Sequence, residues 1–309
     1  MLILFLLLSV SLHQNLTTHP LFIVLACVSL AFSYISATSI NDIADAKIDA
    51  INHSHSIGRP LITGEGNKMD LVAVFVIATL CSLLLAACIN WWAFILVGIS
   101  ILINIAYSLP PTQFSYRTWL APFVLGIAYV GIPYTLGLAI VDRRIEHADV
   151  AWFLGLYAMF VGRIILKDFR DRKGDAKYHK PTFLLRFGKE ATCIFSCMGL
   201  VIGGGIILWQ LRSNGWLILI TALYLVSVLF MLRRLSVSHD GAQEQLSIGV
   251  GAKMGNGLLI TLLAFFSLRQ AGESMSTQLL IAGIVSLIFF INYGIFLRNP
   301  KAAIIGYKG

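Results

Sequence analysis

The stretch that decides the fold runs from Asp70 to Leu109, DLVAVFVIATLCSLLLAACINWWAFILVGISILINIAYSL. It holds two long apolar runs, 70–90 and 92–109, which meet at Asn90, Trp91 and Trp92. A helix needs about 20 apolar residues to cross a hydrocarbon core about 30 Å thick, and tryptophan is enriched where such helices meet the lipid headgroups. The stretch therefore predicts two membrane-spanning helices joined by a tight turn.

The composition extends this prediction to the whole chain. Of its 309 residues, 58% are hydrophobic and 12% are charged, whereas an ordinary soluble domain carries about 25% charged residues. The mean hydropathy is +0.82 and the net charge is +8. So few polar side chains cannot cover a globule in water. This excludes soluble domains, disordered proteins, secreted disulfide scaffolds and nucleic-acid-binding modules, and it leaves membrane lipid as the surrounding partner.

Ten apolar runs along the chain are candidates for spans. The first, which lacks a preceding basic region and a small-residue cleavage site, is expected to be a short uncleaved span. We expect an all-α polytopic membrane protein of nine to ten transmembrane helices, forming one domain over residues 1–309. The runs are 1–17, 20–42, 70–90, 92–109, 119–140, 149–166, 191–211, 215–235, 254–270 and 277–297.

Lysine and arginine divide unequally between the loops on the two sides of this arrangement. Eighteen fall on the side that holds 43–69, 110–118, 167–190, 236–253 and the C-terminal tail, counted with Arg233 and Arg234 at the end of a span, and four fall on the other side. The remaining cation, Arg163, lies within a span. Because short cytoplasmic loops carry an excess of Lys and Arg, the first side is predicted to be cytoplasmic.

Six of the ten aspartates gather in two short segments on that side. The first reads NDIADAKIDA over 41–50, and the second reads KDFRDRKGDA over 167–176. Both contain the pattern D-x-x-D-x-x-x-D-A, which makes them an internal repeat. On a helix, positions i, i+3 and i+7 share one face, so each segment presents a stripe of three carboxylates. A basic residue and a proline follow each stripe, at Arg59-Pro60 and at Lys180-Pro181.

Carboxylates at this spacing repel one another unless a cation lies among them. A hard divalent cation with oxygen ligands meets that need, and Mg²⁺ binds a few carboxylates together with waters and substrate phosphates. Two facing stripes would hold two or more Mg²⁺ ions and a diphosphate, while Arg and Lys would bind the remaining phosphate charge.

With these motifs, residues from about 20 to about 235 resemble the UbiA-type intramembrane prenyltransferase superfamily. The second motif is most similar to that of the homogentisate and digeranylgeranylglyceryl-phosphate branches. The resemblance implies helices around a central chamber with the active site on the cytoplasmic side. It also implies Mg²⁺-dependent transfer of an isoprenoid chain from a prenyl diphosphate to an aromatic or lipid acceptor, with release of pyrophosphate and with Mn²⁺ able to replace Mg²⁺.

The resemblance also implies roles for individual residues. Tyr107-Ser108-Leu109-Pro110-Pro111 is similar to a family segment that is usually followed by a lysine, where this chain has Ser115, and Arg117 is expected to substitute for that lysine. The implied catalytic residues are Asp42, Asp45, Asp49, Asp168, Asp171 and Asp175. The implied metal ligands are Asn41, Asp42, Asp45, Asp168, Asp171 and Asp175. The implied substrate-binding residues are Asn41, Arg59, Tyr107, Arg117, Arg163, Lys167 and Lys180.

Three other classes of membrane protein compete with this interpretation. A secondary transporter would use membrane-adjacent carboxylates for ions, but such sites usually lie near the midplane. A lipid-headgroup phosphotransferase would use Asp and Mg²⁺, but the chain lacks that family's Asp-Gly…Ala-Arg…Gly pattern. A terpene cyclase on the same scaffold would ionise the same diphosphate without an external acceptor. The residues leave the acceptor and the prenyl chain length open.

Overall fold

The computed structural model describes residues 1–52 and 59–299 of the chain. Nine helical segments in these residues are long and apolar enough to span a membrane, and no strand occurs among them. Two further helices are short: α1 (Leu2–His13) and α3 (Pro60–Thr63). The spans are α2 (Pro20–Asn52), α4 (Lys68–Ala87), α5 (Trp91–Ser108), α6 (Leu120–Gly126) with α7 (Ile132–Ile140), α8 (His147–Ile164) with α9 (Asp168–Lys177), α10 (Phe183–Gln210), α11 (Gly215–Val237), α12 (Gly241–Gln270) and α13 (Met275–Arg298).

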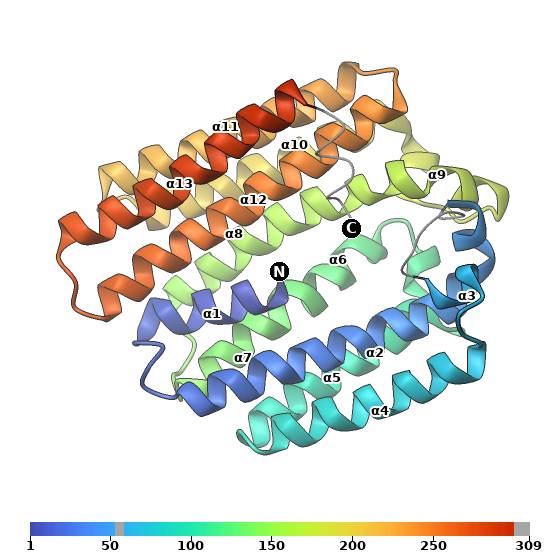
Figure 1. Ribbon diagram of the computed structural model, residues 1–309, viewed down its shortest axis with the longest axis horizontal. Helices are drawn as coiled ribbons and strands as arrows, with labels where there is room; N and C mark the ends of the chain where they lie inside the picture. Colours follow the sequence, from blue (N-terminus) through green and yellow to red (C-terminus); the bar gives the residue numbers. More distant parts are fainter. Residues whose placement is uncertain (53–58, 300–309) are drawn as a thin grey trace.

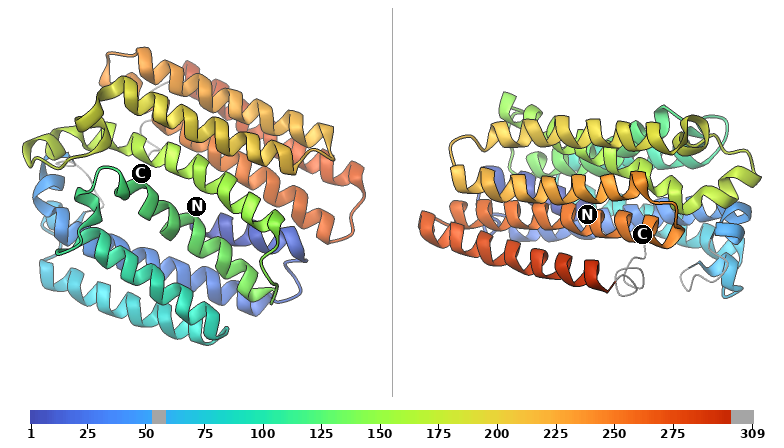
Figure 2. Two further views of the ribbon diagram at one scale, coloured as in Figure 1. Left: turned by 180° about the vertical axis from the view of Figure 1, so that it is seen from behind. Right: turned by 90° about the horizontal axis from the view of Figure 1, so that it is seen from above.

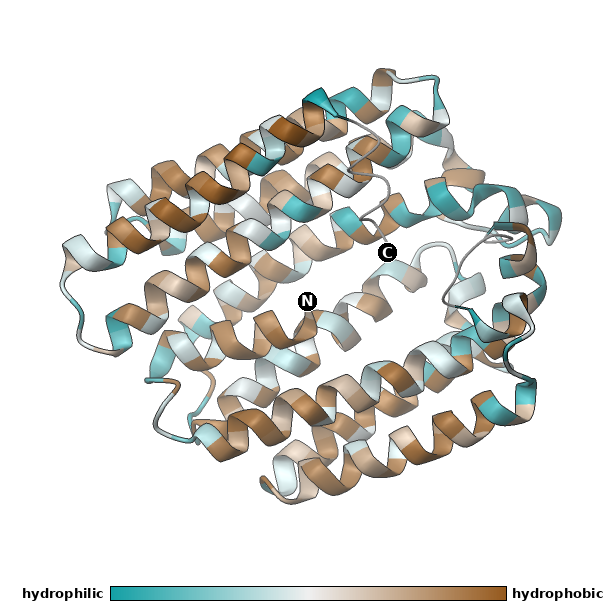
Figure 3. Cartoon of the chain, viewed as in Figure 1, coloured by the Kyte–Doolittle hydropathy of each residue, from teal (hydrophilic) through white to brown (hydrophobic). Residues whose placement is uncertain are grey.

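The helices lie side by side in two groups (Figure 1). One group contains α2, α4, α5 and α7, the other contains α10 to α13, and α8 runs along the boundary between them. The view from above in Figure 2 shows that the helices share one long direction. Figure 3 shows apolar residues along the helices and hydrophilic residues gathered at the end that holds α3 and α9. The expected all-α, polytopic membrane fold is confirmed for the described residues.

The first apolar run differs from the expectation. The helix α1 has 12 residues, which corresponds to a length of about 18 Å and is too short for a hydrocarbon core of about 30 Å. Its buried side chains, among them Leu6 and Leu8, pack inside the bundle instead. The described residues therefore contain nine spans and one short buried helix, not ten spans.

The prediction of a loop over 236–253 is also wrong. In the structure α12 begins at Gly241, so the span predicted over 254–270 is 13 residues longer at its N-terminal end. The added residues mix apolar side chains with glycines, two glutamines, Glu244 and Lys253, which lowers the hydropathy of this part of the helix. Leu246, Val250 and Ala252 are nevertheless buried, because this part of α12 packs against neighbouring helices and not against lipid.

Two prolines, Pro122 and Pro133, lie in the fourth span without breaking it. Between α6 and α7 the chain forms a π-helical turn over Ile127–Gly131, and Pro133 follows at the start of α7. Proline has no N–H to donate and its ring crowds the preceding turn, so a local widening of the helix accommodates it. The span continues as one segment from Leu120 to Ile140.

The helices α8 and α10 approach each other along a seam of glycines. A Cβ atom on Gly203 would lie 2.4 Å from the carbonyl oxygen of Gly155, and one on Gly162 would lie 2.7 Å from the carbonyl oxygen of Ser196. Only residues without a side chain permit such contact, which is how many membrane helices pack. Gly205, two residues after Gly203, has nothing within 4 Å of the same position.

We expect Gly203→Ala to destabilise the protein and Gly205→Ala to be neutral or slightly stabilising. The first substitution forces the backbones of α8 and α10 apart, at a cost of roughly 1–3 kcal/mol or more, whereas the second adds a methyl group in open space. Thermal unfolding of the two variants in the same detergent measures the difference. Equal midpoints for both would show that the seam does not determine stability.

The ends of the helices also allow a test of orientation. The acidic segments lie at one end of the bundle, whereas Cys88 lies in the turn after α4 at the other. The charge distribution predicts that the acidic end is cytoplasmic, although two of the basic residues counted for it, Lys301 and Lys308, lie outside the described residues.

In a chain that keeps only Cys88, an impermeant maleimide added to intact cells should label the protein. A chain that carries only Lys177→Cys should be labelled after the membrane is opened and not before. The reverse pattern would contradict the predicted orientation.

Candidate active site

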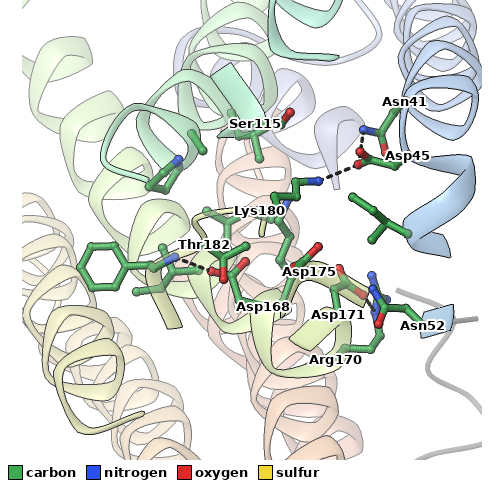
Figure 4. A pocket seen from close by; sticks show the side chains of 18 of the residues that line it. Asn41, Asp45, Asn52, Ser115, Asp168, Arg170, Asp171, Asp175, Lys180 and Thr182 are labelled. Carbon is green, nitrogen blue, oxygen red and sulfur yellow. Dashed lines mark hydrogen bonds and ion pairs between the residues drawn. The ribbon is translucent and has the colours of Figure 1, made fainter. Parts of the chain in front are cut away.

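A pocket opens at the acidic end of the bundle, between α2 and α9 (Figure 4). Both acidic segments contribute to its wall, although they are more than 100 residues apart in the sequence. The loop after α5 and the segment between α9 and α10 complete it. Its polar lining residues are Asn41, Asp45, Asp49, Asn52, Arg59, Tyr107, Ser115, Thr118, Lys167, Asp168, Arg170, Asp171, Asp175, Lys180 and Thr182.

The first stripe lies at the C-terminal end of α2. This helix has 33 residues and a length of about 50 Å, so it is longer than a hydrocarbon core about 30 Å thick and carries its last turns beyond the lipid. Asp45 and Asp49 are buried and line the pocket. The amide of Asn41 donates to Asp45 at 3.2 Å. The segment is helical, as its spacing predicts, and two of its three carboxylates line the pocket.

The second stripe lies on α9, which continues from α8 through a 3₁₀ turn over Ile165–Lys167. Asp168, Asp171 and Asp175 all line the pocket. Asp168 also accepts a hydrogen bond of 3.1 Å from the backbone N–H of Phe183, the first residue of α10. This bond ties α10 to the acidic segment.

Basic side chains lie among these carboxylates, as charge neutralisation requires. One guanidinium nitrogen of Arg59 contacts both Asp42, at 3.0 Å, and Asp49. The ammonium of Lys180 lies 2.7 Å from Asp45 and therefore links the second segment to the first. Such buried pairs hold their side chains in place, since removing one partner leaves an uncompensated charge.

Lys167 also belongs to the basic lining. Lys167 donates to the hydroxyl of Tyr107 at 3.1 Å and lies over the same ring. Burial by itself lowers the pKa of Lys180, but the ion pair with Asp45 outweighs burial and raises this pKa above its ordinary value. Lys180 therefore keeps its positive charge throughout the physiological pH range.

An ion network supports α9 from the side of α12. The buried carboxylate of Glu244 lies 2.7 Å from Lys189 on α10 and 3.6 Å from Arg172 on α9. No sequence pattern connects Glu244 with the acidic repeat, because it lies about 70 residues further on. The network joins three helices at the acidic end of the bundle.

The donor set of the pocket suits a hard cation. Five carboxylates and two side-chain amides offer only oxygen ligands to such an ion. Within residues 1–52 and 59–299, however, no three acidic, histidine or cysteine side chains converge as a ready-made metal site. This arrangement fits Mg²⁺ better than Ca²⁺, because Mg²⁺ uses one or two carboxylates together with waters and substrate phosphates.

Three predicted site residues lie outside the pocket lining. Asp42 is adjacent to it and holds Arg59. Arg117 is exposed and does not line the pocket, whereas Ser115, two residues earlier, is buried in its wall. Arg163 borders two apolar cavities next to α12 and donates to Asn256 at 3.3 Å. The structure therefore does not bring Arg117 and Arg163 together with the other predicted residues.

Five polar lining residues were not predicted: Asn52, Ser115, Thr118, Arg170 and Thr182. A signal existed for Asn52, because it lies three positions after Asp49 and therefore continues the face of the stripe. Nothing in the sequence distinguishes Thr118, whose hydroxyl donates to the carbonyl of Pro181 at 2.5 Å. Such contacts depend on how distant segments pack.

Comparison with known proteins agrees with this geometry. The chain is 30% identical over 172 residues to chlorophyll synthase from rice, Oryza sativa subsp. japonica, a match that covers 53% of this chain and 44% of that protein. The chain thus spans about half the length of the curated relatives it matches.

Two solved structures share the fold. One, of digeranylgeranylglyceryl phosphate synthase, has a TM-score of 0.64 and 21% identity over 86% of this chain and 93% of the other. The other, of a UbiA homolog from Archaeoglobus fulgidus bound to GPP and Mg²⁺, has a TM-score of 0.57 and 20% identity over 98% and 95%.

The match to a family model covers more of the chain than the sequence match to chlorophyll synthase does. This family model describes the UbiA prenyltransferase family and covers residues 2–257, which include both acidic stripes and every polar residue of the pocket. The predicted resemblance is confirmed by this match. This integral, multi-pass membrane protein belongs to the UbiA prenyltransferase family.

Proposed function

We propose that this protein is an intramembrane prenyltransferase, acting as a single domain on the cytoplasmic side of the membrane. It would transfer an isoprenoid chain from a prenyl diphosphate to an aromatic or lipid acceptor and release pyrophosphate. One observation carries the proposal: two acidic stripes from distant segments face one pocket at the membrane edge, with basic side chains between them. A pocket of this kind binds a polyanion through metal ions and cations together.

Each group of residues has a distinct part in binding the diphosphate. Asn41, Asp45, Asp168, Asp171 and Asp175 would hold Mg²⁺, with Asp42 and Asp49 orienting Arg59. When bound, the metal would neutralise phosphate charge and act as a Lewis acid on the leaving group. Arg59, Lys167 and Lys180 would bind the remaining phosphate oxygens directly.

The reaction begins when the C–O bond of the allylic diphosphate breaks and the electron pair leaves with pyrophosphate. The cations of the pocket stabilise the charge that develops on that oxygen, which lowers the barrier. The prenyl cation must then meet its acceptor before it meets water. Leu125, Ile164 and Ile165 form an apolar part of the same wall and exclude water there.

A terpene cyclase would share the ionisation step and differ in having no acceptor. Purified protein incubated with Mg²⁺ and geranylgeranyl diphosphate alone separates the two activities. Formation of a hydrocarbon would identify a cyclase. Turnover only after addition of aromatic or membrane-lipid acceptors, tested with a panel of labelled prenyl diphosphates, would identify a transferase and its substrates.

Both stripes should be required for activity. We expect Asp45→Asn and Asp171→Asn each to lower turnover on the order of 100-fold or more, because each removes an anionic metal ligand at constant size. Asp142→Asn, the same substitution at an exposed site at the other end of the bundle, serves as the control. Rates measured across a Mg²⁺ titration test this. A near-wild-type rate for either pocket variant would remove that stripe from the mechanism.

The cations should bind the diphosphate group and not the acceptor. We expect Arg59→Ala to weaken inhibition by pyrophosphate about ten- to a hundredfold, since a hydrogen bond to a charged group contributes roughly 1.5–3 kcal/mol. Arg59→Lys should recover part of this, because an ammonium cannot form the bidentate contact. Arg144→Ala, at an exposed site on the opposite end, is the control. Unchanged inhibition in Arg59→Ala would assign Arg59 to membrane orientation alone.

A further inference from the structure

Asn52 joins the two acidic segments and is not part of either motif. It is the last residue of α2, one helical turn beyond Asp49, and it lines the same pocket (Figure 4). Its side-chain oxygen accepts a hydrogen bond of 2.6 Å from the backbone N–H of Gly174, which precedes Asp175 on α9. The two helices that carry the acids are therefore in contact at this point.

This contact leaves no room for a side chain at position 174 of α9. A Cβ atom on Gly174 would lie 2.6 Å from the amide nitrogen of Asn52 and 2.6 Å from the carbonyl oxygen of Ile48. Since real Cβ atoms do not approach other atoms so closely, any larger residue would move α9 away from α2. The pair Asn52–Gly174 thus sets the distance between the two stripes.

The same hydrogen bond fixes which way the amide of Asn52 points. A backbone N–H can only donate, so the atom that meets Gly174 must be the amide oxygen. The amide nitrogen is the other end of the group, and it lies beside the position that a Cβ atom of Gly174 would take. It is buried and has no hydrogen-bond partner among the described residues, although a buried N–H group is normally satisfied.

We propose that Asn52 has two functions in the site: its oxygen holds α9 at a fixed distance from α2, and its amide nitrogen donates a hydrogen bond to an oxygen of the bound diphosphate. The inference rests on the proposed function and deepens it. A diphosphate between the stripes presents acceptor oxygens on all sides, and Asn52 offers the pocket a neutral donor next to Asp49 and Asp171.

Two substitutions at Asn52 separate these functions. Asn52→Asp keeps an oxygen that can accept from Gly174 but removes the donor, whereas Asn52→Ala removes both. Binding of pyrophosphate in the presence of Mg²⁺, measured by calorimetry on the full chain in detergent, should weaken roughly tenfold or more in both variants. Only Asn52→Ala should also lower the thermal midpoint and raise the Mg²⁺ concentration needed for half-maximal binding.

A substitution on the other side of the contact tests the spacing. Gly174→Ala places a methyl group against both the amide nitrogen of Asn52 and the carbonyl oxygen of Ile48, so it should move α9 away from α2 and raise the Mg²⁺ requirement several-fold. The matched controls are Ile51→Ala, next to Asn52, and Ala176→Ser, two residues after Gly174, and neither residue lines the pocket. We expect both to behave like the wild-type protein.

The outcomes distinguish this inference from the proposed function. Wild-type affinity for pyrophosphate in Asn52→Asp and Asn52→Ala, with a loss in Asp45→Asn, would overturn the donor role while leaving the proposed function intact. An unchanged Mg²⁺ requirement in Gly174→Ala would overturn the spacing role. If the wild-type protein binds no pyrophosphate at all, both the inference and the proposed function fail.

Discussion

The structure depends on the mutual neutralisation of charges at one end of the bundle. Five carboxylates share a single pocket, and they would repel one another if basic side chains did not lie between them. The ion pair between Lys180 and Asp45 is the most informative of these contacts, because it joins the second acidic segment to the first. Under the proposed function each of these pairs would also prepare the site for substrate, since a phosphate can replace a carboxylate as the partner of a cation.

Much of this arrangement follows from the sequence. The membrane fold could be predicted because backbone groups in lipid must bond within a helix, so long apolar runs allow only one structure. The acidic repeat could be interpreted because helical periodicity fixes which side chains share a face. Asp45 and Asp49 accordingly point into the pocket as expected.

The parts that could not be predicted depend on packing between distant segments. Hydropathy alone does not distinguish a polar loop from a helix whose small residues face other helices, so α12 was predicted too short. The charge of Arg117 favours it over Ser115 as a phosphate contact. The turn after α5, however, buries Ser115 in the pocket wall and leaves Arg117 exposed. Glu244 and its two cations come from three separate helices, which no local pattern brings together.

The glycine seam has a consequence for the acidic end. Because α8 continues into α9 through a single 3₁₀ turn, the two helices form one rod that reaches from the seam to the pocket. Twenty residues separate Gly155 from Asp175, a lever arm of about 30 Å. A tilt of about 4° at the seam would displace the carboxylate of Asp175 by about 2 Å, which is comparable to a metal–oxygen distance. The packing of α8 against α10 in the middle of the membrane therefore helps to set the position of the acidic residues of α9 at its edge.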